Sequence, residues 1–296
     1  MAGFSALVLL WFALLAALPA YAQAPAKSAT KAPEKTGLKP DDPLNPQAFD
    51  HFYNMDYDRS IQEFEQVLKR HPDDPFAVNH LLVAVLFKEL YRMGAMDTSE
   101  YANDSFIAKP HRPADENVKN RIKELVERAE QLEAKKLEAN DKDIEALYAR
   151  GVTRAQFATY TALIERAWFS ALRNAVGARH DHEKVLELDP NYTDAKLIVG
   201  AHNYVMGSLS WGVKVAVAMA GLSGTKEKGI NYLRETAKTT SETSTDAKIV
   251  LMVFLRREKQ YDEAVSYARN LISTYPRNLL IAMEEGNLLR ASGKNT

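Results

Sequence analysis

The chain has 296 residues, of which 46% are hydrophobic and 26% charged, the proportions of an ordinary globular protein. Its 38 basic and 39 acidic residues leave a net charge of −1, which excludes a global field that attracts nucleic acid or an acidic membrane. There are no cysteines, so disulfides, thiolate metal sites, cysteine nucleophiles and a lipidated amino-terminal cysteine are excluded as well.

The amino terminus has the pattern of a secretory signal. The run Phe4–Leu18 is almost entirely apolar and uncharged, and Pro19 and an Ala-x-Ala pattern ending at Ala22 follow it. We therefore expect residues 1–22 to be removed on export, with the periplasm favoured in a Gram-negative cell and secretion as the alternative. No Lys or Arg precedes the run, and its length approaches the roughly 20 residues of a membrane span, so an uncleaved anchor is the other interpretation.

Residues 23–46 are rich in Ala, Pro, Lys and Thr and contain almost no large apolar side chains. Such a segment buries too little apolar surface to offset the entropy lost on ordering, so we expect a flexible linker. The folded domain is then expected to cover residues 47–296.

Apolar residues recur at helical spacing along this domain, for example at Ile122, Leu125 and Ala129. No strand-like alternation persists, and glycine (13) and proline (12) are sparse. The sequence therefore predicts an all-α fold.

An internal repeat is visible at the ends of the predicted helices. Tyr57 opens one helix and Pro72 follows it by 15 residues, and Tyr261 and Pro276 have the same spacing. A third ending of the same form is found at Pro190. Proline stops a helix because it lacks the backbone N–H.

Glycines recur at a fixed distance from these endings. Gly200 and Gly286 each lie ten residues after one of the prolines, and Gly151 lies ten residues after Asp141 in a parallel phrase. A glycine on the inner face of a helix lets a neighbouring helix approach closely, at a cost of about 1 kcal/mol relative to alanine. We expect all three glycines to lie where two helices nearly touch.

These residues resemble the tetratricopeptide repeat (TPR) family, in which a tyrosine and a small residue open the second helix of a hairpin. A proline ends that helix, and a glycine in the next one allows close packing. Ala264 and Gly229 stand at small-residue positions of this pattern. The resemblance covers roughly residues 50–292 and implies a right-handed superhelix of antiparallel helix hairpins, an all-α, TPR-like fold.

The prolines are spaced differently from those of a regular array, which repeats about every 34 residues. Pro72 and Pro190 are 118 residues apart, and Pro190 and Pro276 are 86 apart, so the hairpins must be lengthened. A long loop is expected at 94–116, and the turn of the third hairpin near 160–167. The predicted hairpins are 47–72, 75–140, 143–190, 193–241 and 245–276, with a capping helix at 279–292.

TPR arrays bind peptides on the concave wall formed by the first helix of each hairpin, so the resemblance implies a partner-binding groove there. The polar set with which chaperone-binding members hold a terminal carboxylate is not reproduced, and a mixed aromatic and aliphatic groove is the better prediction. The positions carried over to this chain are Asn79, Tyr148, Val152, Tyr204 and Asn287.

Two other segments are candidate sites. The segment 213–222 has one charge, Lys214, and is interpreted either as a membrane-touching or partner-binding tip or as a helix buried between hairpins. It is too short to span a bilayer. The cluster His180-Asp181-His182-Glu183 could recruit a metal, but residues two apart point away from each other on a helix, which favours a packing or surface role.

Charged residues from Glu116 to Lys142 alternate in sign, which predicts a solvated helix face with i,i+4 pairs.

Together these patterns predict an exported, non-enzymatic scaffold that binds a protein or peptide partner, with no cofactor and no nucleic acid. One alternative is a membrane-associated envelope protein, held by an uncleaved anchor or by the 213–222 segment. The other is a metal-dependent hydrolase that uses His180, His182 and Glu183.

Overall fold

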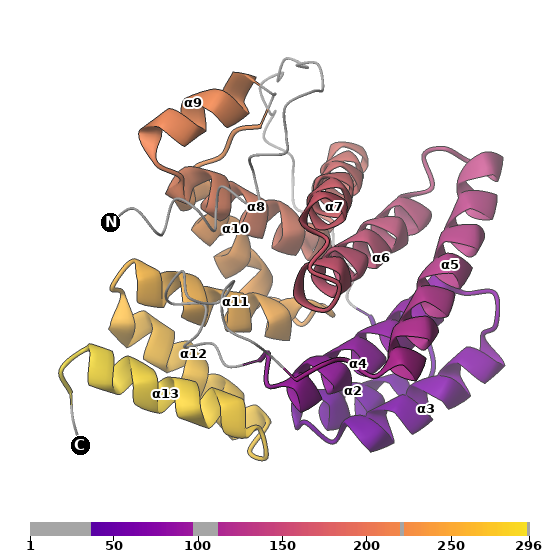
Figure 1. Cartoon of the computed structure of the whole chain (residues 1–296), viewed down its shortest axis with the longest axis horizontal. Helices are drawn as coiled ribbons and strands as arrows, with labels where there is room; N and C mark the ends of the chain where they lie inside the picture. Colours follow the sequence, from indigo (N-terminus) through magenta and orange to yellow (C-terminus); the bar gives the residue numbers. More distant parts are fainter. Residues whose placement is uncertain (1–36, 97–111, 220–221, 295–296) are drawn as a thin grey trace.

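The computed structural model describes residues 37–96, 112–219 and 222–294. The predicted signal peptide, most of the linker and most of the 94–116 loop lie outside these residues. Within them helix is the regular secondary structure, so the predicted all-α fold class is confirmed (Figure 1). The α-helices are α2 (Asn45–Tyr53), α3 (Tyr57–Arg70), α4 (Pro75–Met93), α5 (Glu116–Ala139), α6 (Ile144–Leu163), α7 (Trp168–Leu188), α8 (Lys196–Ser208), α9 (Trp211–Met219), α10 (Lys226–Ala237), α11 (Ser244–Arg257), α12 (Tyr261–Thr274) and α13 (Leu279–Ala291).

The architecture is TPR-like, with hairpins that agree with the predicted bounds. The pairs α2–α3, α4–α5, α6–α7, α8–α10 and α11–α12 each pack together, and α13 caps the last hairpin. Each hairpin also packs against the next one along the chain. The turn of the third hairpin lies within the predicted 160–167 interval. The fourth hairpin differs, because α9 is inserted between its two packed helices.

Helix starts and ends in this chain follow local chemistry. The prolines Pro72 and Pro276 each follow a helix end by two residues, as the sequence predicts. Side-chain oxygens then cap the next helix: Asp74 accepts a backbone N–H of α4, and Asn278 accepts one of α13. Asp143 caps α6 in the same way, with two acceptor contacts of 3.0 Å. A side-chain cap of this kind satisfies N–H groups that have no partner within the helix.

Close helix contacts are found at three of the predicted glycines. A Cβ atom on Gly229 would lie 2.5 Å from the backbone nitrogen of Tyr204 and 2.7 Å from the carbonyl oxygen of Gly200. One on Gly151 would lie 2.4 Å from the His182 ring. Contacts this short leave no room for a methyl group, so the approach of α8 to α10 and of α6 to α7 requires glycine at these positions.

The prediction for Gly286 is wrong. A Cβ atom there would meet nothing within 4 Å, and the residue is exposed. The reason is its place in α13, the last helix of the described chain, against whose outer side no further hairpin packs.

The folded part begins earlier than the expected boundary at residue 47. Asp42 is 5% exposed, and the Arg70 guanidinium donates to it at 2.6 Å and 2.8 Å. The Asn45 side chain is fully buried and donates to the Pro40 carbonyl. Residues 37–46 are therefore packed onto the helices, because polar partners supply the binding energy that this segment's small apolar content cannot.

Substituting Gly229 and Gly286 by alanine separates the two kinds of helical glycine. We expect Gly229→Ala to destabilise the protein by about 1–3 kcal/mol, because backbone atoms of α8 would have to move. We expect Gly286→Ala to be stabilising by up to about 1 kcal/mol, because its Cβ meets nothing and alanine favours the helix. Urea unfolding of both variants measures the difference, and equal effects would contradict the packing described.

Candidate functional site

The residues predicted to line a concave groove are mostly buried, and this prediction is wrong for three of the five. Asn79, Tyr148 and Tyr204 are exposed by only 2%, 3% and 1%. Val152 is half-buried and packs beside the Tyr148 cluster, and Asn287 is half-buried and accepts a hydrogen bond from Arg290. The three buried residues face neighbouring helices, so they cannot form the wall of an open groove.

Asn79 belongs to a buried polar network between α4, α5 and α6. Its amide donates to the Ala149 carbonyl at 3.0 Å, and the Thr153 hydroxyl lies 2.8 Å from its Oδ1. The same hydroxyl lies 2.6 Å from Oε1 of Glu133, which is fully buried. Burial raises the pKa of Glu133 to about 7. The network holds helices together and leaves Asn79 no free group for a partner.

The two tyrosines are also occupied by the chain itself. The ring of Tyr204 stacks on Phe254 with centroids 3.8 Å apart, and its hydroxyl donates to Glu258 at 2.9 Å. Tyr148 lies against the rings of Phe76, His182 and Tyr192, with centroids 4.9 to 5.9 Å apart. Both side chains serve as packing between hairpins.

The inner side of the stack is closed by contacts between its first and last hairpins. The Tyr53 hydroxyl, at the end of α2, donates to Asp246 of α11 at 3.1 Å. The Asn278 amide donates to the Tyr53 carbonyl at 2.7 Å, and the ring of Tyr275 lies 5.1 Å from that of Tyr53. The backbone N–H of Arg277 donates to Asn54. Residues about two hundred positions apart therefore meet where the predicted groove would open (Figure 1).

Titratable side chains gather beside this contact. His80 of α4 lies 2.8 Å from Glu242, and the Thr243 hydroxyl donates to Asp194 at 2.6 Å. Desolvation raises the pKa of Asp246 to about 7; the Tyr53 hydrogen bond opposes this, and the nearby charges of Glu242 and Asp194 add to it. The closing contact therefore includes a carboxyl group that holds its proton up to near neutral pH.

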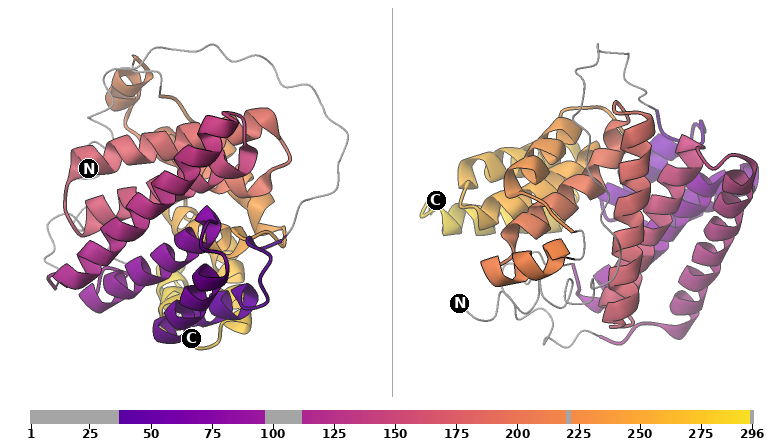
Figure 2. Two further views of the ribbon diagram at one scale, coloured as in Figure 1. Left: turned by 90° about the vertical axis from the view of Figure 1, so that its right-hand side faces the viewer. Right: turned by 90° about the horizontal axis from the view of Figure 1, so that it is seen from above.

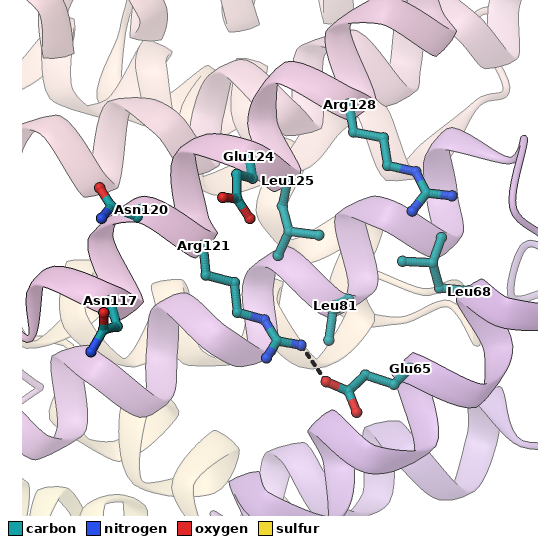
Figure 3. Close-up of a pocket in the computed structure, with 9 residues that line it drawn as sticks. All are labelled: Glu65, Leu68, Leu81, Asn117, Asn120, Arg121, Glu124, Leu125 and Arg128. Carbon is teal, nitrogen blue, oxygen red and sulfur yellow. Dashed lines mark hydrogen bonds and ion pairs between the residues drawn. The ribbon is translucent and has the colours of Figure 1, made fainter.

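An open groove lies elsewhere, on the side where α5 passes over α3 and α4 (Figure 3). Its volume is about 760 Å³. We call it the α3–α5 groove. It is lined by Glu65, Leu68, Leu81, Asn117, Asn120, Arg121, Glu124, Leu125 and Arg128.

The α3–α5 groove has an apolar floor and a polar rim. Leu68, Leu81 and Leu125 lie between the helices and are exposed by 3–8% each. Arg121 reaches across to an ion pair with Glu65, and Figure 3 shows this bridge over the leucines.

The rest of the rim comes from α5. Arg128 donates to the Pro72 carbonyl at 2.7 Å and is half-buried, whereas Asn117, Asn120 and Glu124 are exposed. Amide, guanidinium and carboxylate groups over a narrow apolar floor suit an extended polypeptide, whose backbone both donates and accepts hydrogen bonds.

The sequence analysis missed these residues because it assigned the charges after Glu116 to a plain solvated face. Several of the charges instead reach other helices: Arg121 pairs with Glu65 of α3, and Lys119 and Lys123 pair with Glu165 after α6. One signal was available in the sequence. Polar lining residues of α5 recur at intervals of three or four, from residue 117 to residue 128, which places them on one helix face.

The side chains of the cluster at residues 180–183 do not share a common ligand position. Asp181 is bonded to Arg150 and Arg154 of α6 at 2.6 Å each, and Glu183 pairs with Arg179. His182 is 1% exposed, and burial lowers its pKa to about 4. In the described part of the chain no group of three or more His, Asp or Glu side chains is arranged to hold a metal ion. The packing role favoured for His182 agrees with its contact with Gly151.

Across the described ranges, none of the helices combines the length and apolar character that crossing a bilayer requires.

Comparisons with known proteins give a likeness in structure but none in sequence. No family model matches the chain, and no curated protein matches it in sequence. Among solved structures it is similar to a thermophilic TPR protein of Thermus thermophilus, with 13% sequence identity and a TM-score of 0.43. The match covers 83% of this chain and 97% of the other. The fold assignment above stands on this chain's own helices and their contacts.

Asp246→Asn tests the closing contact through the pH dependence of stability. In the unfolded chain Asp246 ionises near its ordinary pKa of 3.8, whereas the folded protein holds its proton to about pH 7. The wild type therefore loses stability as the pH rises from about 4 to about 7, because only the unfolded state releases the proton freely.

Asparagine can still accept the Tyr53 hydrogen bond and has no proton to lose, so we expect the variant to gain stability over the wild type as the pH rises. From pKa values of 3.8 in the unfolded chain and about 7 in the folded protein, the expected gain is about 4 kcal/mol at pH 8 and less at pH 5. Denaturant unfolding of both proteins across this range measures it, and contributions from Glu133 and His182 cancel in the difference. A difference that stays constant with pH would show that Asp246 is ionised in the folded protein.

Proposed function

We propose that this protein is a non-enzymatic scaffold that binds an extended peptide segment of a protein partner in the α3–α5 groove. The observation that carries the proposal is the contrast between two surfaces. The inner side of the stack is filled by Tyr53, Tyr275 and their hydrogen-bond partners, whereas the α3–α5 groove leaves about 760 Å³ open between three helices. A stack of hairpins has extended surfaces of this kind available for recognition.

The groove's side chains divide into two roles. Asn117 and Asn120 are exposed and carry both donors and acceptors, so they can exchange hydrogen bonds with a peptide backbone. Arg121 is already paired with Glu65 across the groove, so a carboxylate on the partner can replace Glu65 in a charge-assisted contact. We expect the partner segment to be polar and to carry at least one acidic side chain.

Export is part of the proposal and rests on the sequence alone. The apolar run Phe4–Leu18, followed by Pro19 and a small-residue pattern ending at Ala22, supports a cleaved signal and a periplasmic or secreted protein. Sequencing the amino terminus of the natural protein tests this, and a chain that begins at Gln23 is the expected result.

The metal-dependent hydrolase alternative has less support than partner binding. The hydrolase alternative needs His180, His182 and Glu183 to share one ligand, but His182 is buried against α6 while Glu183 is bonded to Arg179 on its own helix. Stability that does not change when zinc is added to a chelator-treated sample is the expected result.

Photo-crosslinking tests the groove. A photoreactive amino acid placed at Asn120 is expected to form adducts with one specific partner in cells. The same residue at Glu130, which is exposed on α5 outside the groove lining, is expected not to. With the partner identified, Asn120→Trp should weaken binding at least tenfold by filling the groove, which corresponds to about 1.4 kcal/mol.

The matched control is Glu130→Trp, which adds the same bulk to the same helix outside the groove. Equal adduct yields at both positions, or a dissociation constant that Asn120→Trp leaves unchanged, would exclude the α3–α5 groove as the binding site.

A further inference from the structure

Helix α9 stands apart from the stack. No other described helix packs closely against it, and Figure 2 shows it set away from the body of the molecule. Trp211 is 82% exposed and Val215 is 44% exposed. A Cβ atom on Gly212 would meet nothing within 4 Å. A short helix with large apolar side chains in solvent is unusual on a monomeric protein and marks an interaction site.

The base from which α9 projects is closely packed. A Cβ atom on Gly207 would lie 2.2 Å from the backbone nitrogen of Lys226, so the two chain segments touch directly below the insertion. Leu209 and Leu222, on either side of the insertion, are exposed by only 6% and 5%. The helix is thus held out from a well-packed base, and its exposure is a built feature of the fold.

The exposed side of α9 is apolar over a broad arc. At about 100° per residue, the exposed positions Trp211, Gly212, Lys214, Val215 and Ala218 span roughly 160° of the helix surface. Lys214 lies at one edge of this arc and is the only charged residue of the helix. A convex apolar ridge with a tryptophan and a lysine has the composition of helices that lie in a membrane interface, where a lysine extends its amino group toward the head groups.

The charge around α9 favours the same partner. The sequence contains no Asp or Glu from Ala195 to Lys226, and Lys214 lies within this stretch. Lys196 and Lys226, near its two ends, are paired with Glu235 and Glu258. The chain has 39 acidic residues, but none lies in this stretch. An anionic surface therefore does not repel it. A groove on a protein partner would need to enclose the whole arc, whereas a bilayer receives a protruding ridge without a matching shape.

We propose that α9 is a membrane-contact element, which inserts Trp211 and Val215 into the interfacial region of a lipid bilayer and leaves the helical stack outside it. With nine residues the helix is about 13 Å long, so it enters one leaflet and does not cross the membrane. The contact is separate from the α3–α5 groove, which can bind a partner whether or not α9 meets lipid.

The absence of cysteine in the chain allows a local test with the full-length protein. Val215→Cys carries an environment-sensitive fluorophore on α9, and Phe169→Cys carries it at a 72% exposed aromatic position on α7 as the matched control. The probes are vesicles of phosphatidylcholine, with or without phosphatidylglycerol. Since the fluorophore reports only its own surroundings, binding by the apolar amino terminus does not imitate the signal.

We expect the fluorescence of the label at position 215 to rise several-fold with vesicles, and to be quenched by lipids that carry a quencher in the upper acyl chain. The label at position 169 should not respond. Trp211→Ser should reduce the response at least fivefold, and Lys214→Glu should reduce it with phosphatidylglycerol but not without it.

Three outcomes would overturn the proposal. No response at position 215 would show that α9 does not meet lipid, and equal responses at both positions would show a contact that is not made by α9. A response that rises with protein concentration in the absence of lipid would show that a second copy of the chain covers the helix.

Discussion

The contact that Tyr53 makes with the far end of the chain determines what the rest of this structure can do. Its hydroxyl contacts Asp246, its carbonyl accepts from Asn278, and its ring lies beside Tyr275. A stack of helix hairpins has no intrinsic reason to close, because each hairpin needs only its neighbours to bury its apolar face. Here the first hairpin also packs against the last one, so the inner side of the stack is buried.

Closure places polar and titratable groups in a setting that penalises charge. His80 is buried and contacts Glu242, and the carboxyl group of Asp246 has a raised pKa. Burying such groups contributes little to stability in itself, because desolvation offsets much of the attraction. Their hydrogen bonds are directional, however, so they fix the relative position of two hairpins that an apolar contact would let slide. Under the proposed function, a partner would therefore meet the outer surfaces of the hairpins.

The sequence predicted those features that local chemistry determines. Tyr57 and Tyr261 open helices, and Pro72 and Pro276 follow helix ends, where the missing proline N–H acts within a few residues. Hairpin bounds followed from the same signals. The predicted groove failed at Asn79, Tyr148 and Tyr204 for a different reason. Whether an inner position faces solvent depends on how strongly the stack curves, and that depends on contacts between residues about two hundred apart.

The α3–α5 groove could be predicted from the sequence only in part. The helix face that lines it was readable from the spacing of its polar residues, but its floor was not, since Leu68 and Leu81 come from two other helices. A polar stripe on one helix has the same sequence pattern whether it faces water or the edge of a groove. Only the angle at which α5 crosses α3 and α4 decides between them, and no local pattern encodes that angle.

The fourth hairpin combines a closely packed helix pair, α8 and α10, with the inserted helix α9. Its helices α8 and α10 pack closely at Gly200 and Gly229, so the hairpin is formed without help from the insertion. On helix α9, Trp211 and Val215 are exposed, so their apolar surface gains no stabilisation from burial. A helix that projects from a closely packed base and exposes apolar side chains to water is what the proposed membrane contact requires.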